Sequence, residues 1–409
     1  MNEDSQSLDL IRKRQWTAGL IGIVGMILWA VGFFAEHDHK QALYGYFFGF
    51  IFWASLTIGC LGIMSLQGAV KATWGVAVVR IMEAAAGPSM MLLLLVLIIP
   101  IAAPGIGLGV LYKWVDVNYM LSDPVLRHKL FFLTPKGFWI RTLIAGVLWT
   151  LWSYILKRSS RRQDTSLDNK EWDLRANWGA VGLVMFFITV TMVATDWVMS
   201  INPYYFSTIY GIIFAIGAGL SAMSLAVLFI LINSDMPPYR AIVTPKLTRD
   251  LGNVFLALTM LWAYTTLSQF LITWQGNLPL EVPYYQHRTG LSFGTAGKGM
   301  DWNVLSSLVI LFQFFVPFLA LLAPRTKRVV RNMIWVALTI GVVRIFTVYW
   351  LIFPDLRPNE GFGGSLTHWT DYAAFFGIGG IWLWTFLYNM SQAPLLPKYD
   401  TRLMEVEHA

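Results

Sequence analysis

Ten long apolar segments divide this sequence, and they decide what the chain can fold into. A helix needs about 20 mainly apolar residues to cross the hydrocarbon core of a bilayer. Lipid offers no hydrogen-bond partner to the backbone, so each segment has to be helical inside the membrane. The sequence therefore predicts an all-α integral membrane protein with about ten spans, at residues 16–34, 43–67, 74–101, 138–156, 177–200, 204–232, 250–274, 301–322, 333–353 and 371–390.

The composition and the loop charges agree with this topology. Only 13% of the residues are charged, whereas a soluble domain carries about 25%. Most lysines and arginines fall in the N-terminal tail and in every second loop, which predicts that both termini are cytoplasmic. Residues 1–15 and 391–409 are then cytoplasmic tails around a membrane domain at 16–390. The basic residues are spread over short loops, so the net charge of +7 does not indicate nucleic-acid binding.

Few residues of the chain are suited to holding a redox cofactor. The single cysteine, Cys60, excludes a disulfide framework, a Cys-x-x-Cys pair and a ligand set for an iron–sulfur cluster. None of the six histidines falls clearly inside a predicted span, which disfavours a membrane-embedded b-type haem. We therefore expect this chain to bind no metal or cofactor of its own.

Charged side chains inside the predicted spans are the first candidates for function, because charge inside a membrane is costly. Glu83 lies nine residues into the third span, which predicts a position near mid-depth, and Arg80 is one turn before it. Arg344 lies near the middle of the ninth span and needs an acid from another helix. We expect Glu83 to be that acid. Glu83 is then either a proton-relay carboxylate or part of a buried ion pair that fixes helix packing.

A second group of polar residues lies at the predicted extracytoplasmic ends of the spans. Its members are Arg141, Asp196, Gln269, His368 and Asp371. The sequence predicts that they surround a polar headgroup at that interface. The alternative is that they cap helices and reach toward lipid headgroups.

Two long extracytoplasmic loops, 102–137 and 275–300, mix aromatic residues, proline, glycine and charge. Loops of this length in a compact protein usually have a function. We expect them to cover a site or dock a partner; the alternative is a passive surface.

These observations leave two classes of protein open. One is a quinol-binding or proton-conducting subunit of a respiratory complex, and the other is a secondary transporter of a small solute. Transporters often have helices broken by glycine or proline at matching positions of two repeats. Pro88 and Pro317 interrupt predicted spans, but the halves show no convincing repeat, which disfavours a transporter.

Several short segments resemble the ActF subunits of bacterial alternative complex III, a family similar to the NrfD or polysulfide-reductase-like membrane subunits. The most specific is Ser-Gln-Phe-Leu-Ile-Thr-Trp-Gln-Gly-Asn-Leu-Pro at 268–279, preceded by Leu-Trp-Ala-Tyr at 261–264. Shorter ones are Arg-Ile-Met-Glu-Ala-Ala-Ala at 80–86, Asp-Trp-Val-Met-Ser at 196–200, Ser-Thr-Ile-Tyr-Gly at 207–211 and Pro-Leu-Leu-Pro at 394–397. The resemblance extends from about the second span to the C-terminal tail.

This resemblance implies ten spans, with spans two to five and six to nine forming two four-helix bundles. The complex lies in the bacterial cytoplasmic membrane and belongs to a respiratory chain of electron transport. It oxidises quinol, either menaquinol or ubiquinol. The electrons pass through iron–sulfur clusters and c-type haems in partner subunits to a terminal oxidase or a soluble electron carrier.

A second NrfD-like membrane subunit is the usual candidate for the quinol pocket, and the ActF type is proposed as its structural partner with a path for proton translocation. On this sequence, the implied proton path falls on Glu83, Asp196, Arg344 and Asp371, with Tyr264 and Gln269 as polar relays. Arg80 and Arg141 are the implied ion-pair partners. The resemblance assigns no residue of this chain to quinone binding.

Overall fold

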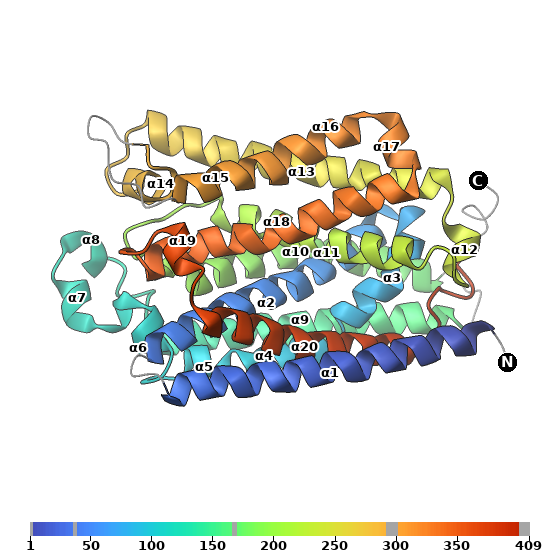
Figure 1. Cartoon of the computed structure of the whole chain (residues 1–409), viewed down its shortest axis with the longest axis horizontal. Helices are drawn as coiled ribbons and strands as arrows, with labels where there is room; N and C mark the ends of the chain where they lie inside the picture. Colours follow the sequence, from blue (N-terminus) through green and yellow to red (C-terminus); the bar gives the residue numbers. More distant parts are fainter. Residues whose placement is uncertain (1–2, 36–38, 166–169, 292–301, 401–409) are drawn as a thin grey trace.

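The computed structural model describes residues 3–35, 39–165, 170–291 and 302–400, and throughout these residues the chain forms helices and no strand (Figure 1). Within these residues, nine helices are long and apolar enough to cross a membrane, and the bent pair, counted as one span, makes a tenth. The prediction of an all-α protein with about ten spans is therefore confirmed. In chain order the spans are α1 (Glu3–Ala35), α2 (His39–Val70), α3 to α5 (Trp74–Ala85, Pro88–Leu97, Ile99–Ala102), α9 (Pro135–Gln163), α10 (Lys170–Trp197), α11 (Tyr210–Ile232), α13 (Pro245–Gln275), α15 to α16 (Trp302–Ile310, Leu311–Phe315 as η3, Val316–Leu322), α18 (Val330–Leu356) and α20 (Trp369–Ser391).

Some predicted boundaries differ from the structure. The predicted N-terminal tail is helical from Glu3 on and continues into the first span. The sixth span begins at Tyr210 instead of residue 204, because the Asn202 side chain accepts a hydrogen bond from the Tyr204 N–H and holds a turn there. Asp301, the predicted first residue of the eighth span, lies outside the described residues.

The third span is broken where proline removes a hydrogen-bond donor. The helices before and after Gly87 are bent by 41°. Pro88 has no N–H for the carbonyl of Ala84, four residues earlier. The side-chain amide of Asn389 on α20 donates to that carbonyl instead, at 2.9 Å, and also accepts a hydrogen bond from Ser89. Another helix thus satisfies a backbone group that lipid would leave unpaired.

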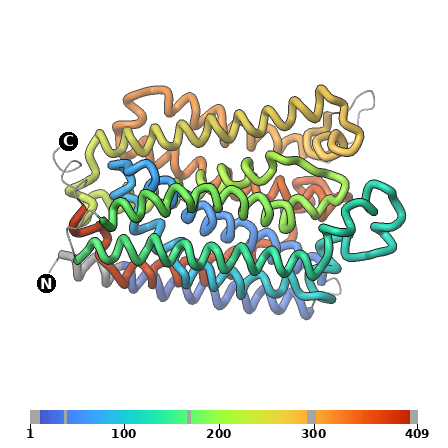
Figure 2. The backbone as a smooth tube through the Cα atoms, turned by 180° about the vertical axis from the view of Figure 1, so that it is seen from behind, coloured from blue at the N-terminus to red at the C-terminus, as the bar shows by residue number. Residues whose placement is uncertain are grey.

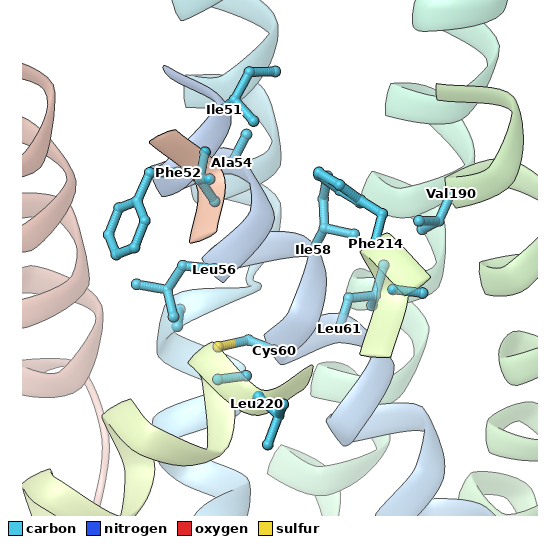
Figure 3. Close-up of a cluster of buried hydrophobic side chains, with 14 of the residues drawn as sticks. Ile51, Phe52, Ala54, Leu56, Ile58, Cys60, Leu61, Val190, Phe214 and Leu220 are labelled. Atoms are coloured by element: carbon cyan, nitrogen blue, oxygen red, sulfur yellow. The ribbon is translucent and has the colours of Figure 1, made fainter. Parts of the chain in front are cut away.

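The spans pack as two rings of four helices. Helices α2, α3 to α5, α9 and α10 form the first bundle, and α11, α13, α15 to α16 and α18 form the second. The bundles meet where α2 lies against α11. A Cβ on Gly59 would lie 2.0 Å from the carbonyl oxygen of Ala218, so only glycine permits this approach. Figure 3 shows the apolar cluster around this contact, with Ile58, Cys60 and Leu61 of α2 beside Leu220 of α11.

Helices α1 and α20 flank the bundles and pack along each other. Their contact is made of small residues: a Cβ on Gly25 would lie 2.6 Å from the Cα atom of Gly377, and one on Gly380 would lie 2.2 Å from the N atom of Gly22. Close backbone approach of this kind drives helix association in lipid, where the hydrophobic effect between helices is weak. The first and last spans are therefore neighbours, as Figures 1 and 2 show.

The two ends of the molecule differ in structure. One end, here called the terminal face, carries the start of α1, the end of α20, α12 (Tyr239–Ile242) and α17 (Pro324–Arg328) (Figure 1). The opposite end, the loop face, carries short helices: α6 (Leu108–Leu111), η1 (Lys113–Val115), α7 (Val117–Leu121), α8 (Pro124–Arg127), η2 (Met199–Ile201), α14 (Val282–Thr289) and α19 (Phe362–Ser365). That the terminal face is cytoplasmic stays a prediction.

Candidate functional site

Glu83 lies in a buried cluster of charges near the terminal face. Arg80 donates to Glu83 Oε2 at 2.8 Å, the contact that their spacing of three residues predicts. Arg80 also donates to both carboxylate oxygens of Asp164 at 2.5 Å. Arg161 Nε lies 3.4 Å from Glu83 Oε2. The side chain of Glu83 is fully buried, and its Oε1 has no partner within the part of the chain that the structure describes.

Glu83 lies level with the terminal-face end of α9. Arg161 and Asp164 stand at that end, and Arg161 contacts Glu83. The spans are longer than the bilayer requires: α2 has 32 residues and α9 has 29, or roughly 45 Å each against a hydrocarbon core of about 30 Å. The mid-membrane depth of Glu83 stays a prediction, because counting from the first apolar residue does not fix where the bilayer lies along such a helix.

Arg344 is not joined to Glu83. It belongs to the second bundle, where its Nε donates to Ser221 Oγ at 3.4 Å and its guanidinium lies against Gly217. Among the described residues, no carboxylate lies within ion-pair distance of it. The predicted Glu83–Arg344 network is therefore wrong, because the two residues face the interiors of different bundles.

Asp196 and Arg141 form an ion pair at the loop-face end of the first bundle. Arg141 donates to the two carboxylate oxygens of Asp196 at 2.6 and 2.9 Å and to the carbonyl of Phe132 at 2.9 Å. Its guanidinium also stacks on the Phe132 ring, 3.9 Å from the centroid. Asp196 is almost completely buried. The structure thus brings together two residues that the sequence placed in one polar group.

The other members of that predicted group lie apart from this pair. Asp371 accepts hydrogen bonds from Arg357 at 2.7 and 2.9 Å. His368 Nε2 lies 3.0 Å from a carboxylate oxygen of Glu360. Gln269 donates to Thr273 of its own helix at 3.2 Å. The Arg357–Asp371 and His368–Glu360 pairs adjoin, because the Glu360 N–H donates to the Arg357 carbonyl at 3.1 Å and the Asp371 N–H to the His368 carbonyl at 3.2 Å. Among the described residues, no hydrogen bond or ion pair joins them to Arg141–Asp196 or to Gln269, so the polar rim is divided into separate groups.

Tyr264 faces outward. Its exposed fraction is 69%, and it lies on the side of α13 away from the second bundle. A side chain in this position contacts lipid or a partner, and it is not connected to the buried carboxylates.

Sequence reasoning missed several residues of these pairs. Arg161, Arg288 and Arg357 counted as loop charges that set the topology, yet each lies in an ion pair with a carboxylate. Arg288 donates to Asp355 at 2.5 Å and is fully buried. The only available signal was that these arginines stand within a few residues of predicted span ends.

A row of buried polar side chains follows α9 between the two charged ends of the first bundle. Thr142 accepts from Trp197 at 3.0 Å, and Trp149 donates to Thr189 at 2.8 Å. Ser153 and Ser160 continue along the same buried face, and Ser160 accepts from Arg80 at 3.3 Å. The row therefore starts beside Asp196 and ends beside the Arg80–Glu83 pair.

The first long loop covers the loop-face end of this bundle. Tyr112 donates to the carbonyl of Trp197 at 2.8 Å, and Trp114 donates to Ser200 at 3.0 Å. Lys129 donates to the carbonyl of Pro203 at 2.6 Å, and burial lowers the pKa of its ammonium group. These contacts pack the loop over the end of the bundle beside Asp196. That the loop covers a site or docks a partner stays a prediction.

The described part of the second loop packs against the second bundle. Tyr284 of α14 stacks on Tyr205 with the ring centroids 3.8 Å apart. Burial raises the pKa of the Tyr284 and Tyr285 hydroxyls, which therefore stay neutral. Among the described residues, no three His, Cys, Asp or Glu side chains gather where they could hold a metal ion.

The geometry thus provides two buried acid–arginine pairs at opposite ends of one bundle, with polar side chains between them. No protein-family model and no curated protein matches this chain.

Proposed function

We propose that this chain is a membrane subunit of a quinol:electron-acceptor oxidoreductase of the alternative complex III type, in the bacterial cytoplasmic membrane. In this role it supports quinol oxidation and carries protons through its first bundle. The local resemblance to ActF-type subunits supports the assignment to the complex, as does the multi-span helical architecture. Partner subunits supply the iron–sulfur clusters, the c-type haems and the second NrfD-like membrane subunit.

One observation carries the proton path: Glu83 and Asp196 are buried carboxylates at opposite ends of the same bundle, with the polar row along α9 between them. Hydroxyl groups both donate and accept hydrogen bonds, so they can pass a proton along a chain. The two longest intervals in the row, from Thr142 to Trp149 and from Ser153 to Ser160, are each roughly 10 Å at 1.5 Å per residue. Water has to bridge both intervals.

Within the described residues, Glu83 has a carboxylate oxygen without a hydrogen-bond partner, whereas Asp196 has no such oxygen. Both oxygens of Asp196 accept from Arg141, whereas Oε1 of Glu83 is free of protein partners in the described structure. A proton on Oε1 therefore breaks no existing hydrogen bond. The proposed path includes fewer residues than the one that the resemblance implies. The residues outside the row are Arg344, Asp371, Tyr264 and Gln269.

A groove on the outer side of the second bundle suits the hydrocarbon chain of a quinol or a lipid. It measures about 400 Å³ and lies between α15 and α18, lined by side chains such as Leu305, Phe312, Trp335 and Phe346. The mainly apolar lining fits an isoprenoid or acyl chain, and none of the described lining residues is charged. It is compatible with a supporting role beside the subunit that oxidises quinol.

A secondary transporter is the alternative, and the broken third span favours it. A second interruption, the π-helical turn η3, falls in the eighth span. The bundles begin with spans two and six, which both run from the loop face to the terminal face. The third span therefore corresponds to the seventh, and the interruptions do not match as transporter repeats require.

The assignment is tested first by co-purification. The tagged native protein is solubilised in mild detergent, and its reduced-minus-oxidised spectrum and subunit list are recorded. We expect c-type haem, an iron–sulfur subunit and a second multi-span subunit. A colourless protein without partners would contradict the assignment and lead to solute-uptake assays.

The proton path is tested in the same complex. We expect Glu83→Gln to leave assembly intact and to lower the number of protons released per quinol oxidised. Asp173→Asn is the matched control, because Asp173 lies in an exposed ion pair with Lys71. Unchanged proton stoichiometry and turnover in Glu83→Gln would reduce Glu83 to a packing residue.

A further inference from the structure

The core of the second bundle contains a buried positive charge without a negative partner. The exposed fraction of Arg344 is 2%, and its hydrogen bond is to the neutral Ser221 hydroxyl at 3.4 Å. Its guanidinium occupies the space that a side chain at Gly217 would fill, since a Cβ there would lie 2.5 Å from Nη2. The described part of the chain places no carboxylate within 4.0 Å of it.

This arrangement differs from that of three other buried arginines. Arg80, Arg288 and Arg357 each contact an aspartate or glutamate at 2.5 to 2.8 Å. A guanidinium cannot release its proton in a protein, so Arg344 cannot become neutral. A buried charge without a counter-charge costs several kcal/mol. A counter-charge for Arg344 therefore has to come from outside the described chain.

A side chain bonded to the next turn of α18 carries an unused hydrogen-bond donor. Thr347, one turn from Arg344 on α18, donates to Gln313 Oε1 at 3.3 Å. The other end of that amide, Gln313 Nε2, is fully buried and has no partner among the described residues. Buried donors of this kind usually bond to a water molecule or an ion.

The backbone around Gln313 is also irregular. Gln313 lies at the centre of η3, a π-helical turn within an otherwise α-helical span. Pro317 has no N–H for the carbonyl of Gln313, four residues earlier, and the chain makes one wide turn there. Such turns are frequently found at functional sites. The turn is positioned where it directs the amide of Gln313 toward the face of α18 that carries Thr347.

We propose that the core of the second bundle binds a small monovalent inorganic anion, of which chloride is the most common, between Arg344 and Gln313 Nε2. One negative charge neutralises the arginine, and both groups donate hydrogen bonds. Water alone satisfies donors but leaves the charge uncompensated. Because Arg344 and Gln313 are buried among four helices, a lipid headgroup or a partner's side chain does not reach them. The site does not depend on the proposed role in quinol oxidation.

The test uses the intact protein in mild detergent, prepared in gluconate buffer without halide. Sodium bromide replaces sodium gluconate at constant ionic strength while the unfolding temperature is recorded, and binding of radioactive chloride is measured by equilibrium dialysis. We expect saturable binding of about one anion per chain and a rise in unfolding temperature. No saturable binding to the wild-type protein would overturn the proposal.

Two variants assign the binding to this site. We expect Arg344→Met to abolish halide binding and to unfold at a higher temperature than the wild type in gluconate, because the uncompensated charge is gone. Gln313→Leu keeps the charge and removes one donor, so the half-saturating bromide concentration should rise about tenfold, the effect of one hydrogen bond to an ion. Arg331→Met, at an exposed arginine of α18, is the control and should bind halide as the wild type does.

Two results would contradict this assignment. Saturable binding that survives Arg344→Met would place the anion elsewhere. If Arg344→Met cannot be purified in folded form, Gln313→Leu decides alone, and an unchanged half-saturating bromide concentration would overturn the site.

Discussion

Arg357 donates one hydrogen bond to each carboxylate oxygen of Asp371, at 2.7 and 2.9 Å, and so ties the ends of the last two spans together. Both side chains are almost completely buried. Removing one partner of such a pair leaves a buried charge, which costs about 3–5 kcal/mol. Asp371→Asn should therefore lower the unfolding temperature markedly in detergent. Asp173→Asn, in an exposed pair, should change it little. Equal unfolding temperatures for the two variants would show that the buried pair stabilises the protein no more than the exposed pair does.

Glu83 and Arg344 should act independently on stability. They lie in different bundles and share no partner in the described structure. Distant sites usually add within about 0.3–0.5 kcal/mol. The double variant Glu83→Gln/Arg344→Leu should therefore show the sum of the two single effects in unfolding measurements. A coupling energy above about 1 kcal/mol would mean that the two residues interact after all.

Replacing Gly25 by leucine should separate α1 from α20. A Cβ at this position would lie 2.6 Å from the Cα atom of Gly377, so both backbones have to move. Overpacking of this kind typically costs about 1–3 kcal/mol. Thermal unfolding and limited proteolysis of the first span would reveal the change. Ile23→Leu, at an exposed position of the same helix, is the control. If both variants resist protease equally, the glycine contact is not what holds α1.

His287 should make the loop face less stable in acid. Burial lowers the pKa of this imidazole below its ordinary value of 6.5, and the neighbouring Arg288 lowers it further. The unfolded chain then binds a proton at a higher pH than the folded chain does, so stability falls as the pH falls below about 6.5. Unfolding temperatures between pH 7.5 and pH 5 should decline less in His287→Gln than in the wild type. Parallel profiles would exclude His287 as the source.

Hydropathy predicted the ten spans well because lipid leaves the backbone no alternative to a helix. The Arg80–Glu83 contact was also predictable, since both residues lie on one helix at a spacing of three. Ion pairs between different helices were not predictable. Arg357 and Asp371 are close only because α18 and α20 meet at the loop face. Hydropathy does not encode the order of helices around a bundle.

The surroundings of Glu83 show a second limit. Apolar segments longer than the bilayer leave the position of the membrane along each helix open, so the sequence did not place Arg161 beside Glu83. The charge of Arg344 was found correctly, but its surroundings depend on Ser221 and Gln313, which look like ordinary polar residues of apolar helices.

The contact between α1 and α20 also concerns how the chain is made. Helix α1 leaves the ribosome long before α20 does, so the glycine face of α1 has no partner in the bilayer until α20 has been synthesised. At roughly 5–20 residues per second, this interval lasts on the order of tens of seconds. During that time, Gly22 and Gly25 form an open surface that any helix with small residues can occupy. In a chain that stops before Trp369 this glycine surface stays uncovered. Such fragments should be recognised by membrane quality control or bound by a neighbouring helix.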